Sequence, residues 1–279
     1  MQGKKIGIAL AGGGARGAYQ VGALEVLKAH GYLDNIHAIS GVSVGSLNAC
    51  LLAMDRIDLA EKLWLDLEEN DLFDTDVNWF EVLRQQNLKL LNKGVFDTSR
   101  LEKIIDDNID FDLIRQKDVY VTTAYVADKE VGLFDTITLG LKNFFEKDGR
   151  VIYNHLKTMS NDEIKTTILA SCALPVMFKP VSIHGKTFYD GGILDNESYK
   201  PLIDAGCDEI IFIDLWRFKL RHFPRKSHVD GVNIRHIHPK KSLKGIMDFD
   251  HDKIMYRFNQ GKLDAKHAIN QWIEANNKT

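Results

Sequence analysis

The chain has 279 residues, 44% of them hydrophobic and 27% charged, which is enough to bury the core of one large α/β domain or two small ones. The formal net charge of −3 argues against nucleic acid as the main partner, and no apolar run reaches the ~18 residues of a membrane-spanning helix. The first residues lack the apolar core and cleavage site of a signal peptide, which favours a cytoplasmic protein with membrane association left open. Three widely spaced cysteines, Cys50, Cys172 and Cys207, predict reduced core thiols and no metal site.

The first part of the chain alternates between strand and helix patterns. Strands are predicted over 5–10 and 36–40, and helices over 17–30 and 47–54. Two strands joined by a helix of this length are typical of a parallel β-α-β unit.

The rest of the chain continues to mix strands and helices. Ser160 and Glu163 form a capping box that opens a predicted helix through residue 171, and the apolar run 209–215 is typical of a buried parallel strand. The other predicted helices cover 55–81, 97–108 and 250–276, and the other predicted strands cover 119–126, 131–139, 181–183, 187–189 and 233–238. This pattern predicts an α/β fold.

Gly41, Ser43 and Gly45 form a G-x-S-x-G motif between the second strand and the helix that follows it. A serine on a sharp strand-to-helix turn is held exposed, and flanking glycines let the backbone turn without a Cβ clash. The N-terminus of the following helix favours negative charge at the serine. The motif alone occurs often by chance, but in this setting it predicts that Ser43 is a nucleophile.

Gly12, Gly13 and Gly14 follow the first strand and open a glycine-rich run that ends at Gly17. Consecutive glycines present backbone N–H groups to an anion with no side chain in the way. The run also fits the dinucleotide fingerprint G-x-G-x-x-G, but the acidic residue expected after the second strand is missing, since Asp34 lies before that strand. We therefore expect an oxyanion hole for a tetrahedral acyl intermediate, with a dinucleotide site as the weaker alternative.

Asp190 stands before Gly191 and Gly192 at the end of a strand pattern, a position that by itself is typical of a turn. A catalytic role for Asp190 becomes more plausible because the serine has no obvious histidine partner. No downstream histidine has a distinguishing motif, and the three in the charged stretch (222, 228 and 238) are expected to face solvent. The candidate histidines are His222, His228, His236, His238 and His251.

Three motifs in order, G-G-G-x-R-G, G-x-S-x-G and D-G-G, resemble the patatin-like phospholipase family over about 5–215. Residues 170–180 are similar to the family's A-S-x-A-x-P-x-x-F-x-P block. Asn196 stands where the family often has asparagine, whereas the proline that commonly follows is Ser198 here. The part after about residue 215 matches only loosely.

The resemblance implies a three-layer α/β fold with a mostly parallel central sheet flanked by helices. It implies a catalytic domain over 5–215, with a C-terminal strand and helix over 216–279 packed on it. In the implied Ser–Asp dyad, Ser43 is the nucleophile and Asp190 the general base, and a lipid or phospholipid ester is the substrate with no metal or other cofactor. Supporting residues are Arg16, which is expected to fix the glycine loop, and Gly17, Gly41, Gly45, Gly191 and Gly192. An acyltransferase with the same dyad and a non-catalytic protein that binds lipid or nucleotide remain alternatives.

The segment 217–244 contains nine Lys/Arg residues and one acidic residue. It is either a solvated loop or a patch for anionic lipid head groups, where each charge contributes about 1 kcal/mol near a membrane. Met247, Phe249 and Met255 follow it and are expected in the core rather than against lipid. The acidic run 66–76 is expected to be a solvated connection rather than a lid.

Overall fold

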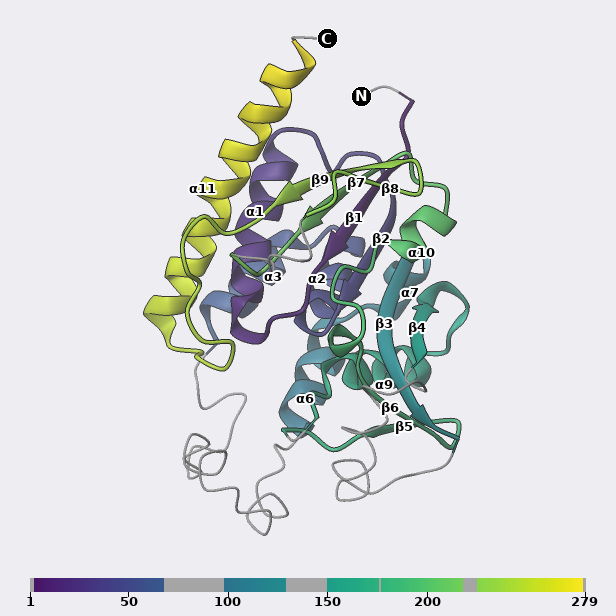
Figure 1. The fold of residues 1–279 in the computed structure, drawn as a ribbon. Helices are drawn as coiled ribbons and strands as arrows, with labels where there is room; N and C mark the ends of the chain where they lie inside the picture. The colour runs from purple at the N-terminus through teal and green to yellow at the C-terminus, as the bar shows by residue number, and fades with distance from the viewer. Residues whose placement is uncertain (1–2, 68–97, 129–149, 176, 218–224, 278–279) are drawn as a thin grey trace.

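The computed structural model describes residues 3–67, 98–128, 150–175, 177–217 and 225–277. In this part of the chain, nine strands form one open sheet in the order β5-β6-β3-β2-β1-β7-β9-β8, and β4 also pairs with β3 (Figure 1). The strands are β1 (Ile6–Leu10), β2 (Ile36–Val42), β3 (Asp118–Ala127), β4 (Arg150–His155), β5 (Val181–Ile183), β6 (Lys186–Asp190), β7 (Glu209–Ile213), β8 (His228–Val229) and β9 (Val232–Ile237).

The five central strands, β3, β2, β1, β7 and β9, run parallel. Every residue of β1 and β7 is buried, as expected where helices cover both faces of a parallel sheet. The chain passes from β1 to β2 on one side and later returns to β7 on the other side of β1, so the strand order reverses at β1. The carboxyl ends of strands at such a reversal are the usual place for a ligand in open α/β sheets, and the glycine run follows β1 there.

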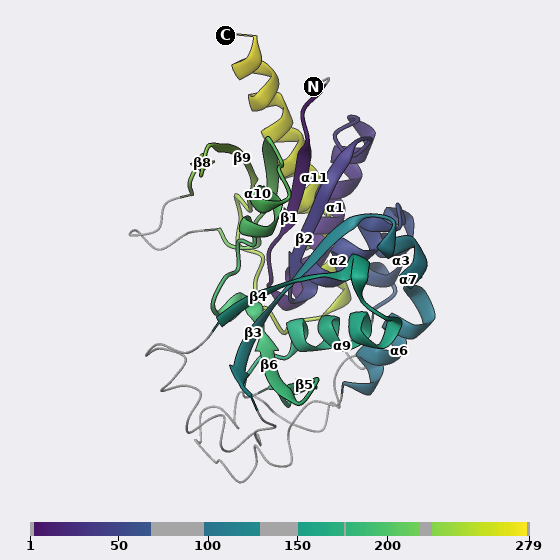
Figure 2. The same cartoon turned by 90° about the vertical axis from the view of Figure 1, so that its right-hand side faces the viewer.

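Helices cover both faces of the sheet (Figure 2). The short helix α10 lies on one face, and α1, α2 and α11 lie on the other. The described helices of five or more residues are α1 (Gly17–Ala29), α2 (Val44–Ala53), α3 (Ile57–Leu65), α6 (Ser99–Asn108), α7 (Phe111–Arg115), α9 (Asn161–Cys172), α10 (Lys200–Asp204) and α11 (His251–Asn276). None of the helices in these described ranges is long and apolar enough to cross a membrane.

The C-terminal helix α11 packs along α1 with unusually close backbones. A Cβ on Gly22 would lie 2.0 Å from the carbonyl oxygen of Phe258, and a Cβ on Gly261 would lie 2.0 Å from that of Tyr19. Strand β9 and helix α11 therefore share the sheet and the apolar core with the preceding part of the chain. The division of the chain at residue 215 stays a prediction.

The predicted α/β class and the mostly parallel sheet with flanking helices are confirmed. The capping box at Ser160 is present, and the predicted strands 181–183 and 187–189 form β5 and β6, which pair as an antiparallel hairpin. Helix α2 begins at residue 44, three residues before its predicted start, because the turn at Ser43 leads directly into it. The pattern does not predict α7, α10, β4 or β8, since elements of two to six residues show too little periodicity. The predicted strand 131–139 and nearly all of the acidic run 66–76 lie outside the described residues.

Candidate active site

Ser43 lies on the turn between β2 and α2 and is 7% exposed. Its backbone adopts φ 55° and ψ −133°, a region that non-glycine residues rarely occupy and that costs about 1–3 kcal/mol. The turn also requires glycines, since a Cβ on Gly41 would lie 2.3 Å from the carbonyl oxygen of Gly45, and a Cβ on Gly45 would lie 2.3 Å from that of Leu10. The strained turn places the serine at the N-terminus of α2, where the helix dipole favours negative charge.

Two other buried serines hold this turn in place. The Ser43 N–H donates to Ser171 Oγ at 2.8 Å, and the Ser171 hydroxyl donates to the Thr122 carbonyl oxygen at 2.8 Å. The Ser46 hydroxyl donates to the carbonyl oxygen of Ser43 at 2.6 Å. Ser171 belongs to the 170–180 block, where the sequence alone indicates no role for it; the structure shows that it fixes the backbone of the turn.

The register of the sheet brings Asp190 to Ser43. Val42 lies opposite Thr122 in the β2–β3 pair, and Asp190 lies opposite Thr123 in the β3–β6 pair, so both residues flank the same point of β3. Asp190 is 1% exposed, and its Oδ1 accepts from the Gly192 N–H at 2.8 Å. The other carboxylate oxygen, Oδ2, has no hydrogen-bond partner within the described residues.

The environment of Asp190 changes its protonation. Burial raises the pKa of this carboxyl to about 7, because removal from water disfavours the charged form, while the Ser43 hydroxyl and the Gly192 N–H lower the pKa in part. Gly191 allows this end of β6 to approach β3, since a Cβ there would lie 2.5 Å from the carbonyl oxygen of Thr122. A carboxyl with a pKa near neutrality can both accept and return a proton near pH 7.

No histidine of the described chain lines the cavity beside Ser43. His236 Nε2 lies 2.8 Å from a backbone carbonyl oxygen. His238 is half-buried rather than solvent-facing, because it directly follows the buried end of β9, and its burial together with nearby cations lowers its pKa to about 4. His228 and His251 are exposed, and His222 lies outside the described residues.

The three glycines after β1 are not equivalent. The Gly12 N–H donates to Asn196 Oδ1 at 2.8 Å, and Asn196 Nδ2 donates back to the Gly12 carbonyl oxygen at 3.3 Å. Gly12 therefore does not offer the free amide that the sequence led us to expect. The N–H groups of Gly13 and Gly14 find no acceptor in the described chain, and Gly14 lines the same cavity as Ser43. Of these two glycines, Gly14 is the one that belongs to the described cavity lining.

The glycine loop is tied to the residues that follow β9. Gly14 has φ +54°, and a Cβ there would lie 2.2 Å from the carbonyl oxygen of Ile246, so only glycine fits. The Ala15 N–H donates to this same oxygen at 2.7 Å. Arg16 donates from Nη2 and Nε to the Lys244 carbonyl oxygen at 2.6 and 2.9 Å, which ties this end of the loop to the segment after β9.

Ser198, where the family commonly has proline, has its own structural role. Its φ of 52° is one that proline, with φ fixed near about −65°, does not adopt. Its carbonyl oxygen accepts from the Ser40 hydroxyl at 2.7 Å, and its Oγ lies 2.7 Å from Thr122 Oγ1. Proline would therefore not fit the backbone at position 198 of this chain.

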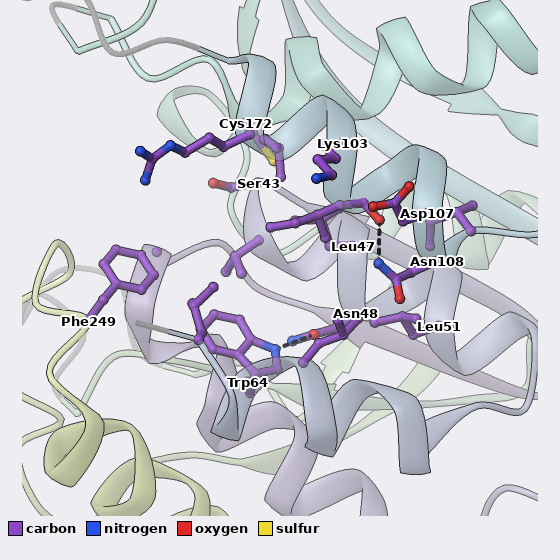
Figure 3. Close-up of a pocket in the computed structure, with 18 of the residues that line it drawn as sticks. Ser43, Leu47, Asn48, Leu51, Trp64, Lys103, Asp107, Asn108, Cys172 and Phe249 are labelled. Carbon is purple, nitrogen blue, oxygen red and sulfur yellow. Dashed lines mark hydrogen bonds between the residues drawn. The ribbon is translucent and has the colours of Figure 1, made fainter. Parts of the chain in front are cut away.

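A cavity of about 690 Å³ opens beside Ser43, within the range of about 300–1,000 Å³ for small-molecule sites. Figure 3 shows Ser43 and Cys172 on one side of it, with Leu47, Asn48 and Leu51 of α2 along its length. Its walls are mostly apolar and come from α2, α3, α6 and the residues after β9, while Arg100, Lys103 and Asp107 of α6 add charges. Burial raises the pKa of the Cys172 thiol, which keeps it protonated.

Two aromatic residues of the cavity wall have no motif in the sequence. Trp64 and Phe249 stack with ring centroids 6.5 Å apart and an interplanar angle of 4°. Gly17 makes room for them, because a Cβ there would lie 2.5 Å from the Trp64 ring. Phe249 is buried, as expected, but both it and Met247 also line the cavity, which the sequence did not indicate.

The fold and the serine turn place the chain in the class of α/β proteins that carry a nucleophile-elbow motif. Residues 8–203 match the patatin-like phospholipase family, and the chain belongs to this family. The crystal structure of VipD from Legionella pneumophila has the same fold, with a TM-score of 0.60 and 14% sequence identity over 96% of this chain and 67% of that one.

Curated relatives are similar at low identity. An uncharacterised NTE family protein from Mycobacterium tuberculosis is 26% identical over 214 residues, which cover 76% of this chain and 49% of the relative. The lysophospholipase NTE1 from Cryptococcus neoformans var. neoformans is 24% identical over 216 residues, which cover 76% of this chain and 11% of that protein. The chain therefore spans half or less of the length of these two relatives.

Proposed function

We propose that the chain is a lipid acyl hydrolase in which Ser43 is the nucleophile and Asp190 the general base. The proposal is carried by one observation, a serine on a strained turn beside a buried carboxyl whose pKa is raised to about 7. Asp190 accepts the hydroxyl proton while Oγ attacks the ester carbonyl carbon, and the alcohol leaves with that proton as the ester C–O bond breaks. Asp190 then takes a proton from a water molecule whose oxygen attacks the acyl carbon, and it returns that proton to Ser43 Oγ as the bond to the acyl group breaks and the fatty acid leaves.

The negative charge of the tetrahedral intermediate is stabilised from two directions in this proposal. The open N–H groups of Gly13 and Gly14 form the oxyanion hole, and the N-terminus of α2 lies behind the serine. Gly12 positions the loop through its two hydrogen bonds with Asn196 and donates nothing to the substrate. Loss of one oxyanion donor typically lowers kcat by about 10²–10³-fold.

The cavity supports the acyl chain of a lipid as the group that is bound. Asn48 lines it, but its polar atoms are engaged within the protein: Nδ2 donates to Gln20 Oε1 at 2.8 Å, and Oδ1 accepts from Trp64 Nε1 at 3.0 Å. The wall therefore offers a hydrocarbon chain few unsatisfied polar groups. A relative named lysophospholipase favours a phospholipid or lysophospholipid ester over other acyl esters.

Two alternatives make different predictions. An acyltransferase would use the same residues and pass the acyl group to an alcohol, so product analysis with and without an acceptor alcohol separates it from a hydrolase. A dinucleotide site would need several free amides in the glycine loop. The Gly12 amide is bound to Asn196, which leaves fewer free amides than a pyrophosphate needs.

We also propose a peripheral contact with anionic membranes through part of the segment 217–244. Two of its arginines are paired with buried carboxylates, Arg225 with Asp214 at 3.1 Å and Arg235 with Glu209 at 2.8 Å, so they are not available to lipid. The proposed contact therefore uses fewer than the nine basic residues of this segment. Its exposed lysines include Lys226, Lys241 and Lys244.

Labelling with a fluorophosphonate tests the proposed nucleophile. Wild-type protein should carry the label on Ser43 and hydrolyse nitrophenyl esters, and Ser43→Ala should lose both by at least about 10³-fold. Ser182→Ala, which changes an exposed serine on β5, is the matched control and should keep both. Turnover within a few-fold of wild type in folded Ser43→Ala protein would contradict the proposal.

A further inference from the structure

The segment 243–249, which follows β9 and lies outside the family match at 8–203, contributes to the cavity wall. Met247 and Phe249 both line the cavity, and Phe249 is only 5% exposed. Figure 3 shows Phe249 and Trp64 on one side of the cavity and Ser43 on another. The segment 243–249, which follows the family's motifs in the chain, would therefore contact a ligand bound in the cavity.

Trp64 gives Phe249 a fixed partner. Its Nε1 donates to Asn48 Oδ1 at 3.0 Å, and its ring lies against Gly17 at the start of α1. Because the indole is held on both sides, the stacked Phe249 ring occupies a defined position in the wall. A change at position 249 therefore alters the shape of the cavity without touching Ser43.

Arg257 of α11 holds the 243–249 segment through backbone contacts. Its guanidinium is fully buried and donates to the carbonyl oxygens of Leu243 at 2.8 Å, Gly245 at 2.9 Å and Asp248 at 2.6 Å. A fourth bond of 3.4 Å reaches the carbonyl oxygen of Ala15 in the glycine loop. A buried cation is costly unless its donors are satisfied, so this set of acceptors fixes the segment relative to the loop beside Ser43.

From these contacts we propose that the 243–249 segment determines which acyl chains the cavity accepts. Phe249 and Met247 are its selectivity residues, and Arg257 is the positioning residue that holds them. The proposal rests on the acyl hydrolase function above, with the ester carbonyl at Ser43 and the hydrocarbon chain in the cavity. A phenyl ring and a thioether offer apolar contact, so they meet the chain rather than a polar head group.

The test separates binding from catalysis. In a Ser43→Ala background, dissociation constants are measured for saturated fatty acids of eight to eighteen carbons. Phe249→Ala should shift the preference toward longer chains, and Met247→Trp should shift it toward shorter ones. Each should change the ratio of long-chain to short-chain affinity by roughly tenfold or more. With Ser43 restored, kcat/KM for nitrophenyl esters of the same chain lengths should change in the same directions.

Phe258→Ala is the matched control, because Phe258 is also a buried phenylalanine, 4% exposed, but lies on α11 and does not line the cavity. It should leave the chain-length profile unchanged. Arg257→Lys keeps the positive charge but loses the several N–H donors of the guanidinium group. We therefore expect affinity to depend less on chain length in this variant. A wild-type profile in Arg257→Lys would overturn the positioning role.

The remaining outcomes are also decisive. An unchanged profile in folded Phe249→Ala and Met247→Trp overturns the selectivity role, and Met247→Trp decides alone if Phe249→Ala does not fold. Shifted fatty-acid affinities in a protein that hydrolyses no ester would support the selectivity role and refute the proposed hydrolase.

Discussion

Asp190→Asn should remove ester turnover and at the same time stabilise the protein at neutral and alkaline pH. Wild-type Asp190 is 1% exposed, and its pKa rises from 3.8 to about 7, mainly through burial. Between these two values the folded protein retains a proton that the unfolded chain releases. The free energy of unfolding therefore falls as the pH rises through this window, by about 1.4 kcal/mol per unit.

The total over this window is about 4 kcal/mol, since the pKa shift covers about three units at about 1.4 kcal/mol each. Asparagine does not titrate, so the stability of Asp190→Asn relative to wild type should increase by that amount between pH 4 and pH 8. The same ionisation governs activity. A base must be deprotonated, so wild-type kcat/KM should rise with pH to a plateau above pH 7 and fall to roughly a tenth of the plateau one unit below the pKa.

Urea denaturation of both proteins from pH 4 to pH 8 measures the first effect, and the pH profile of ester hydrolysis measures the second. Asp34→Asn, a change at an exposed carboxyl, is the control for loss of one negative charge. The reasoning would be refuted if the stability difference were independent of pH. It would also be refuted if Asp190→Asn kept turnover within a few-fold of wild type.

Three further predictions follow from the site. Alanine at each downstream histidine should leave most of the activity, whereas a Ser-His-Asp triad would make one of these variants as inactive as Ser43→Ala in the ester assay. Gly14→Ala should lower kcat by about 10²-fold or more, because its Cβ would meet the Ile246 carbonyl oxygen at 2.2 Å and displace the loop amides. Gly185→Ala, with φ +73° and nothing within 4 Å, carries a similar backbone cost and should keep turnover, so equal losses in the two variants would refute this account. Replacing Lys241 and Lys244 with glutamine should weaken co-sedimentation with anionic vesicles and reduce its salt dependence, whereas Lys200→Gln on α10 should not; no difference between these variants would favour a solvated loop.

Two of the three motifs in the sequence follow neighbouring parallel strands, β1 and β2. Carboxyl ends of parallel strands meet at one edge, so the glycine run after β1 and Ser43 after β2 come together there. Asp190 reaches the same place through the antiparallel pairing of β6 with β3, which a turn-like D-G-G pattern does not reveal by itself. Its proposed role came from the family resemblance.

Other parts of the site depend on contacts between distant residues, which no local pattern encodes. Asn196 occupies the Gly12 amide from 184 positions away, so the sequence could not show which loop amides stay open. Trp64 and Phe249 read as ordinary apolar positions, and periodicity predicts their burial but not that they line a cavity. His238 was expected in solvent because of its charged neighbours, whereas its place directly after β9 buries it in part.

The link between Arg257 and the glycine loop also has a consequence for the order of synthesis. The loop is translated before Arg257, which follows Ala15 by 242 positions, and before the Ile246 carbonyl that accepts from the Ala15 N–H. Domains fold as units while the ribosome adds about 5–20 residues per second. A nascent chain that has not yet reached residue 244 therefore contains Ser43 and Asp190 but lacks the partners of Ala15 and Arg16 that hold the glycine loop.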